Sequence, residues 1–242
     1  EHLKSEKTNG NINFRCAVEC ICRKITPNVY VPYRNSADGK MLIHLASRLR
    51  QCENYSEDFH SVGEFDVTNM TEDNYHDYFA QLEKMYPSNR RKKVVDIFEN
   101  WKLKDCVLYL IPYVGINYSV YKYDAFSVVL HDAFHSGTAC VQKGEKCSKY
   151  DKFSILYLLD KCFKSKKNID VFFAPSEMKQ GTYETVSVIG NHTVNGKRVN
   201  FLNGYTSEMA YVKLLIAYSL FENEEYRKQF IYNEYNFEVI QP

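Results

Sequence analysis

The stretch DAFSVVLHDAFH, residues 124–135, carries the signals on which the fold prediction depends. Asp124 is of a residue type that begins helices, and it precedes an apolar stripe formed by Val128, Leu130 and Phe134. This pattern predicts an amphipathic helix across the stretch.

The same stretch holds two histidines four residues apart, in the order His131-Asp132-Ala133-Phe134-His135. On a helix these imidazoles could share a metal ion, and Asp132 could act as a general base. However, Asp is one methylene shorter than the Glu of H-E-x-x-H zinc motifs, and no obvious third ligand follows. The rings would also lie beside the apolar stripe, which favours hydrogen-bonded structural histidines. We therefore predict no catalytic residue, metal or cofactor, and keep a metal-dependent hydrolase as the less favoured alternative.

An apparent internal similarity extends outward from this stretch. The intervals Cys20–Cys52 and Cys106–Cys140 enclose 31 and 33 residues, and Asp38 and Asp124 each follow the first cysteine by eighteen positions. We interpret this as a degenerate two-fold repeat, with chance similarity between helices as the alternative. The predicted parts are a flexible arm at 1–13, a first helical repeat at 14–101, and a second helical repeat with a hairpin insertion at 102–242.

The predicted fold is mainly α, stabilised by disulfides. One region near residues 182–201 is expected to form a small β-hairpin, because extended apolar runs flank the turn signal Asn195-Gly196. Apolar periodicity predicts helices over 39–52, 71–86, 89–101, 148–164, 206–221 and 224–235.

The cysteines and glycosylation sequons predict a secreted protein with N-linked glycans. An even number of cysteines without C-x2-C knuckles favours disulfides over zinc, and the pairing stays open, with Cys147–Cys162 and Cys140–Cys162 as local candidates. The predicted disulfide residues are Cys16, Cys20, Cys22, Cys52, Cys106, Cys140, Cys147 and Cys162. The sequons place glycans at Asn54, Asn69, Asn117 and Asn191.

Charge and hydropathy exclude two classes of partner. The net charge of +1 supplies no field for polyanions, so we predict no nucleic acid partner. No apolar run approaches the length of a membrane helix, so we predict no membrane span.

A group of tyrosines offers aromatic bodies with polar tips, which line ligand pockets and protein interfaces but also occur in ordinary cores. The predicted ligand-binding residues are Tyr109, Tyr113, Tyr118, Tyr121 and Tyr123.

The cysteine spacing is similar to that of a known family. Between Cys106 and Cys162 the cysteines are separated by 33, 6 and 14 residues, which resembles the later cysteines of insect odorant-binding domains. The Cys16-x3-Cys20 pair resembles the adjacent cysteines of that family. Tandem copies of the domain form the D7 salivary proteins of blood-feeding flies. This resemblance implies helical pockets that bind amines or eicosanoids.

A second resemblance rests on the Cys20-Ile21-Cys22 motif and on the richness in Tyr, Asn and Lys. These features resemble the bicycle proteins, secreted salivary effectors of gall-forming aphids. Both resemblances imply delivery in saliva and binding without catalysis. We therefore predict a secreted, extracellular, non-enzymatic binding protein, a salivary effector acting on a host protein, with a carrier of a small hydrophobic ligand as the alternative.

Overall fold

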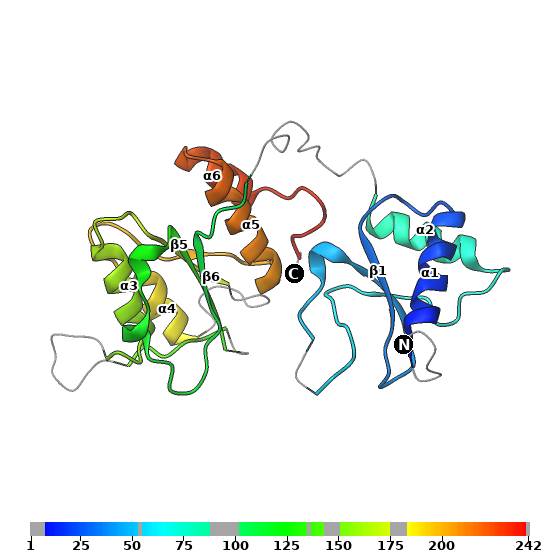
Figure 1. The fold of residues 1–242 in the computed structure, drawn as a ribbon, viewed down its shortest axis with the longest axis horizontal. Coiled ribbons are helices and arrows are strands. Elements are labelled where there is room, and N and C mark those ends of the chain that lie inside the picture. The colour runs from blue at the N-terminus through cyan, green and yellow to red at the C-terminus, as the bar shows by residue number, and fades with distance from the viewer. Residues whose placement is uncertain are drawn as a thin grey trace. The chain divides into compact units, whose positions relative to one another are not determined.

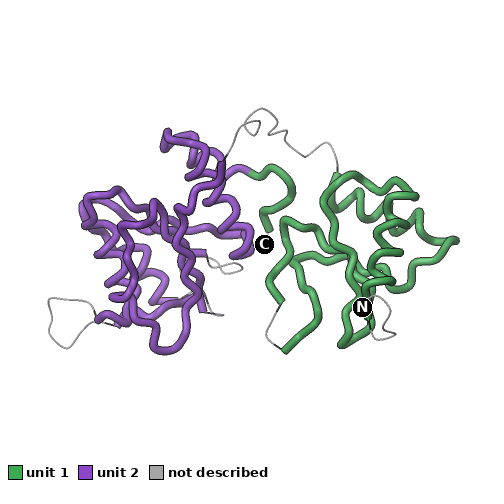
Figure 2. The backbone as a smooth tube through the Cα atoms, in the orientation of Figure 1, with its two compact units in different colours: residues 1–93, 234–240 green, residues 94–233, 241–242 purple. Residues whose placement is uncertain are grey.

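The chain folds into two compact units (Figure 2). The computed structural model describes residues 8–52, 55–87, 102–134, 137–142, 151–174 and 183–240. Unit 1 comprises Glu1–Lys93 with Glu234–Ile240, and unit 2 comprises Val94–Asn233 with Gln241–Pro242. Each unit has its own sheet and its own apolar core.

Unit 1 is built on a small antiparallel sheet in the order β1-β2-β3. Its elements are α1 (Gly10–Cys22), β1 (Tyr30–Arg34), β2 (Met41–Leu45), the 3₁₀ turn η2 (Ala46–Arg48), β3 (Phe65–Asp66) and α2 (Tyr75–Met85) (Figure 1). Strand β2 is central, and four of its five residues are buried. Its apolar side chains pack with Leu82 of α2 and with Phe237 from the C-terminal segment.

The turn between β1 and β2 explains why a predicted helix is absent. Asp38-Gly39 lies in this turn, and Gly39 has a φ of +70°, in the left-handed region that favours glycine. The carboxylate of the buried Asp58 accepts the backbone N–H of Ser36. Asp-Gly between apolar runs is a hairpin signal, and the apolar run after it fits a buried central strand. The predicted helix over 39–52 is therefore wrong.

Unit 2 is an α/β layer structure around a parallel sheet in the order β4-β5-β6-β7. Its strands are β4 (Val107–Leu110), β5 (Val128–Asp132), β6 (Asp170–Ala174) and β7 (Asn200–Phe201). Its helices are α3 (Ile155–Lys164), α4 (Glu184–Asn191), α5 (Ser207–Leu220) and α6 (Glu224–Tyr232), with 3₁₀ turns η5 (Tyr118–Val120) and η6 (Tyr123–Ala125).

The connections place the helices of unit 2 on both faces of this sheet. Helices α3 and α4 connect successive parallel strands in one direction across the sheet, and right-handed crossovers place such connections on the same face. Ile155 and Ile189 accordingly pack with Val129 and Phe173 in one core. Helix α5 follows the last strand and packs on β4 and β5, on the side of the sheet away from α3 and α4 (Figure 1). There Tyr109 contacts Tyr211 of α5.

The predicted mainly α class is wrong, and so is the two-fold repeat, because unit 1 has an antiparallel sheet and unit 2 a parallel one. The stretch 124–135 contains η6 and the buried strand β5 instead of a helix.

The predicted hairpin near 182–201 is also absent, because the structure has helix α4 and the short β7 there. Asn195-Gly196 does form a turn, which is closed by the bridge between Val194 and Lys197. Helix α1 begins at Gly10, inside the segment predicted as an arm. The predicted helix over 89–101 lies outside the described residues.

The predicted disulfide framework is also wrong. Every cysteine that the structure describes is a free thiol, and Cys147 lies outside the described residues. Burial raises the pKa of the Cys162 thiol to about 12, which leaves it protonated at neutral pH. This thiol acts as a small apolar side chain in the unit 2 core.

Within the parts of the chain that the structure describes, no helix has both the length and the apolar character needed to cross a bilayer.

Candidate functional site

Two side chains meet at the carboxyl edge of the parallel sheet, on the face covered by α5. Tyr109 of β4 pairs in register with Leu130 of β5, and Asp132 lies two residues further along β5 on the same face. Two residues of a strand span about 6.6 Å, which a tyrosine side chain can reach. The Tyr109 hydroxyl accordingly donates a hydrogen bond of 3.1 Å to Asp132 Oδ2. The other carboxylate oxygen, Oδ1, accepts the N–H of Ala133 at 2.7 Å, which fixes the orientation of the carboxylate.

Helix α5 brings a third oxygen to this pair. Thr206 is its N-cap and accepts the N–H of Met209, so that Ser207 is the first helical residue. The Ser207 hydroxyl lies close enough to the Tyr109 oxygen to lower the pKa of that phenol. Tyr211, one helical turn later, holds the Tyr109 ring at a centroid distance of 5.9 Å. The side chains of Ser207, Tyr109 and Asp132 thus form a line of three oxygen groups, which we call the hydroxyl relay.

The surroundings keep the phenol of the hydroxyl relay protonated. Burial raises the pKa of Tyr109, and the negative charge of Asp132 raises it further. The Ser207 hydroxyl opposes this increase, because it can donate a hydrogen bond to the phenolate. At neutral pH Tyr109 therefore holds its proton between a hydroxyl and a carboxylate, all three half-buried.

The ends of parallel strands are where open α/β sheets bind ligands, and the first turn of a helix offers backbone N–H groups to negative charge. The hydroxyl relay lies at both features. Its chemistry is that of a hydroxyl nucleophile whose proton can pass through a phenol to a carboxylate.

His131, next in the chain to Asp132, has a structural role. Its side chain is fully buried, its Nδ1 donates to the backbone oxygen of Asp132, and its Nε2 accepts the hydroxyl of Tyr118 at 2.7 Å. Burial lowers the pKa of His131 to about 4, and the bond to the Asp132 oxygen opposes this decrease. A neutral ring with both nitrogens bonded is not free to bind a metal, and no group of three metal-ligating side chains exists in the described residues. The HDAFH metal site is not supported, and His135 lies outside the described residues.

His131 gives the stability of unit 2 a defined dependence on pH. In the unfolded chain, His131 binds a proton when the pH falls below about its ordinary pKa of 6.5. In the folded chain, it binds the proton only when the pH falls below about 4. Above pH 6.5 the neutral ring makes its full contribution to the free energy of unfolding, and this contribution is lost as the pH falls from 6.5 toward 4. We expect the free energy of unfolding of the wild type to fall more steeply over this window than that of His131→Gln. Urea unfolding at a series of pH values measures the difference; equal slopes would contradict the buried neutral histidine.

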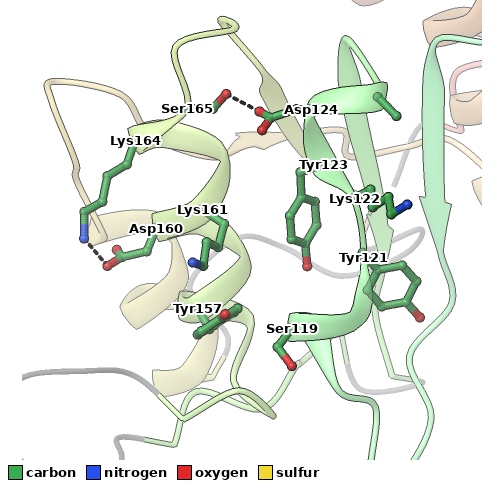
Figure 3. Close-up of a pocket in the computed structure, with 11 residues that line it drawn as sticks. Ser119, Tyr121, Lys122, Tyr123, Asp124, Tyr157, Asp160, Lys161, Lys164 and Ser165 are labelled. Atoms are coloured by element: carbon green, nitrogen blue, oxygen red, sulfur yellow. Dashed lines mark hydrogen bonds and ion pairs between the residues drawn. The ribbon is translucent and has the colours of Figure 1, made fainter.

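The five tyrosines predicted to bind a ligand do not form one site. Tyr109 belongs to the hydroxyl relay, Tyr113 is exposed, and Tyr118 is buried against His131. Tyr121 and Tyr123 line a separate hollow beside α3, shown in Figure 3. Sequence reasoning thus named Tyr109 and Asp132, but it missed Ser207. The only signal for Ser207 was its place at the start of a predicted helix.

The sequons stay predictions. Asn69 and Asn191 are exposed, and Asn54 lies outside the described residues. The Asn117 side chain accepts the N–H of Ser119 at 3.0 Å and its hydroxyl at 2.7 Å.

Comparisons with known proteins inform the fold. No protein-family model matches the chain, and no curated protein matches it. Among solved structures the chain is similar to the thermostable L-asparaginase from Thermococcus kodakarensis, with 12% sequence identity and a TM-score of 0.58. The match covers 99% of this chain and 65% of that chain, so the protein spans about two thirds of the length of that enzyme. At this identity the similarity concerns the fold.

These findings correct the predicted function. We predicted a non-enzymatic effector, or alternatively a helical carrier of the odorant-binding type, but the fold is α/β, and one solved structure with a similar fold is an enzyme. The helical fold expected for both predictions is therefore wrong, and the similarity to an enzyme does not support a non-enzymatic binding protein. The predictions of secretion and of a salivary source stay untested.

Proposed function

We propose that this protein is a hydrolase that forms a covalent acyl-enzyme on Ser207. The observation that carries this proposal is the hydroxyl relay itself: the Tyr109 hydroxyl donates to Asp132 at 3.1 Å and lies beside the hydroxyl of Ser207. Serine is a weak nucleophile until a neighbouring group removes its proton. The relay supplies such a path, with Asp132 as the final proton acceptor.

The reaction follows from these contacts. Ser207 Oγ attacks the carbonyl carbon of the substrate, its proton passes to the Tyr109 oxygen, and the phenolic proton passes to Asp132. Backbone N–H groups in the first turn of α5 favour the negative charge that develops on the carbonyl oxygen. When the bond to the leaving group breaks, that group takes the proton back through Tyr109. Water then attacks the ester by the same route, releasing an acid and restoring Ser207.

The fold neighbour suggests the substrate class. The neighbour is named for L-asparagine, which carries a side-chain carboxamide. We propose that the substrate is a small carboxamide and that its hydrolysis releases ammonia. Simple activated esters should also react, because they need less assistance for the leaving group.

The experiment is a hydrolysis assay of the full chain with asparagine, glutamine, simple carboxamides and a nitrophenyl ester. We expect turnover of at least one amide and of the ester. Tyr109→Phe should reduce kcat by about a hundredfold with little change in KM, because it removes only the oxygen that transfers the proton.

Two results would overturn the proposal. One is that the folded wild type hydrolyses none of these compounds. The other is that Tyr109→Phe retains full activity with an unchanged circular dichroism spectrum.

A further inference from the structure

A hollow of about 1130 Å³ lies in unit 2 beside helix α3 (Figure 3). One wall is the segment 119–125, which contains Tyr121 and Tyr123, and the other is α3 with Tyr157 and Lys161. Because α3 covers the sheet face opposite to α5, this hollow is separate from the hydroxyl relay. Neither the proposed hydrolysis nor the fold neighbour assigns a role to it.

The charges around the hollow favour an anion. Of its two carboxylates, Asp160 bonds to both Lys164 and His192, and Asp124 accepts the hydroxyl of Ser165. This leaves Lys122 and Lys161 without a carboxylate partner among the described residues. Together with Lys164, the hollow has three lysines against two aspartates, and this net charge of +1 attracts negative charge.

The aromatic side chains favour a planar ring on that anion. The hydroxyl of the buried Tyr123 donates to a backbone oxygen at 2.6 Å, so its ring forms an apolar wall. Tyr121 and Tyr157 are half-buried and lie on opposite walls, as Figure 3 shows. Lys161 Nζ lies 5.3 Å from the centre of the Tyr157 ring, so a ring-stacking surface and a cation are adjacent.

We infer that this hollow binds a small anion that carries a planar ring. The ring stacks on Tyr157 beside the wall formed by Tyr123, and the anionic group contacts Lys161. The volume is large enough for a ligand of the size of a nucleoside monophosphate. An aromatic phosphate and an aromatic carboxylate share this chemistry. Binding here requires no catalysis at Ser207, so it stands or falls independently of the proposed hydrolysis.

Isothermal titration of the full chain tests the inference with five probes: adenosine monophosphate, adenosine, inorganic phosphate, phenyl phosphate and phenylacetate. We expect a ring-bearing anion to bind at least about tenfold more tightly than adenosine or inorganic phosphate, because only it uses both the ring surface and the cations. A preference for the phosphates over phenylacetate identifies an aromatic phosphate, and the reverse identifies an aromatic carboxylate.

Variants locate the binding. Lys161→Gln and Tyr157→Leu should each raise the dissociation constant by about tenfold or more, since each removes one of the two recognition elements. Lys166→Gln is the matched control, because Lys166 is exposed, close to α3 in sequence, and outside the hollow. The inference is overturned if no ring-bearing anion binds at millimolar concentration, or if Lys161→Gln binds as tightly as Lys166→Gln.

Discussion

Ser207→Ala is expected to reduce kcat/KM for amide or ester hydrolysis by at least about a thousandfold, because no acyl-enzyme can form without its hydroxyl. Asp132→Asn should cause a loss of similar size, since an amide cannot accept the proton that Tyr109 passes on. Steady-state kinetics with the best substrate of the panel measures both losses. The two effects should not add in the double variant, because the residues act as one unit.

Ser187→Ala provides the control for this series. Ser187 is exposed on α4, which packs on the sheet face opposite to α5. We expect it to retain the activity of the wild type. If Ser207→Ala stays within tenfold of this control, Ser207 is not the nucleophile.

The largest effect on stability is expected for Phe173→Ala. Phe173 is fully buried in β6, where its ring stacks on His131 at 5.7 Å and meets Phe201 edge to face at 5.8 Å. Removing a buried phenyl ring costs about 3–5 kcal/mol, because apolar contacts are lost and a cavity remains. Urea unfolding followed by circular dichroism measures the change in the free energy of unfolding.

Phe153→Ala is the matched control, because its side chain is 40% exposed. It should lower the free energy of unfolding by less than about 1 kcal/mol. Equal effects of the two substitutions would show that Phe173 is not the centre of the unit 2 core.

Long periodic segments of the sequence predicted their elements correctly. Helices α2, α5 and α6 lie inside the predicted ranges 71–86, 206–221 and 224–235, because each is long enough for a 3.6-residue period to be distinctive. Short apolar runs were the source of the errors. Val128-Val129-Leu130 is as compatible with a buried parallel strand as with a helix, and its β-branched residues favour the strand.

The hydroxyl relay could be predicted only in part for a related reason. Tyr109 was singled out as a ligand-binding residue and Asp132 as a possible general base. The sequence does not indicate the parallel strand register that brings the two side chains together. Ser207 reaches them only because the chain crosses the sheet and returns on its other face. Once a parallel sheet is known, residues at the carboxyl ends of its strands become the first candidates.

The cysteine count misled for a chemical reason. An even number of cysteines is compatible with disulfides but does not require them, and geometry decides the outcome. Cys106 and Cys162 are buried as thiols, and Cys106 lies 3.9 Å from the hydroxyl of Ser219. Buried thiols of this kind contribute packing rather than cross-links.

The central claim, that Ser207 is an activated nucleophile, is tested most directly by treating the full chain with a fluorophosphonate and mapping the adduct by peptide mass spectrometry. The hydroxyl relay predicts a single dominant adduct on Ser207, formed much more slowly in Tyr109→Phe and Asp132→Asn. An unmodified Ser207 in the folded wild type, or labelling at the same rate in all three proteins, would contradict it.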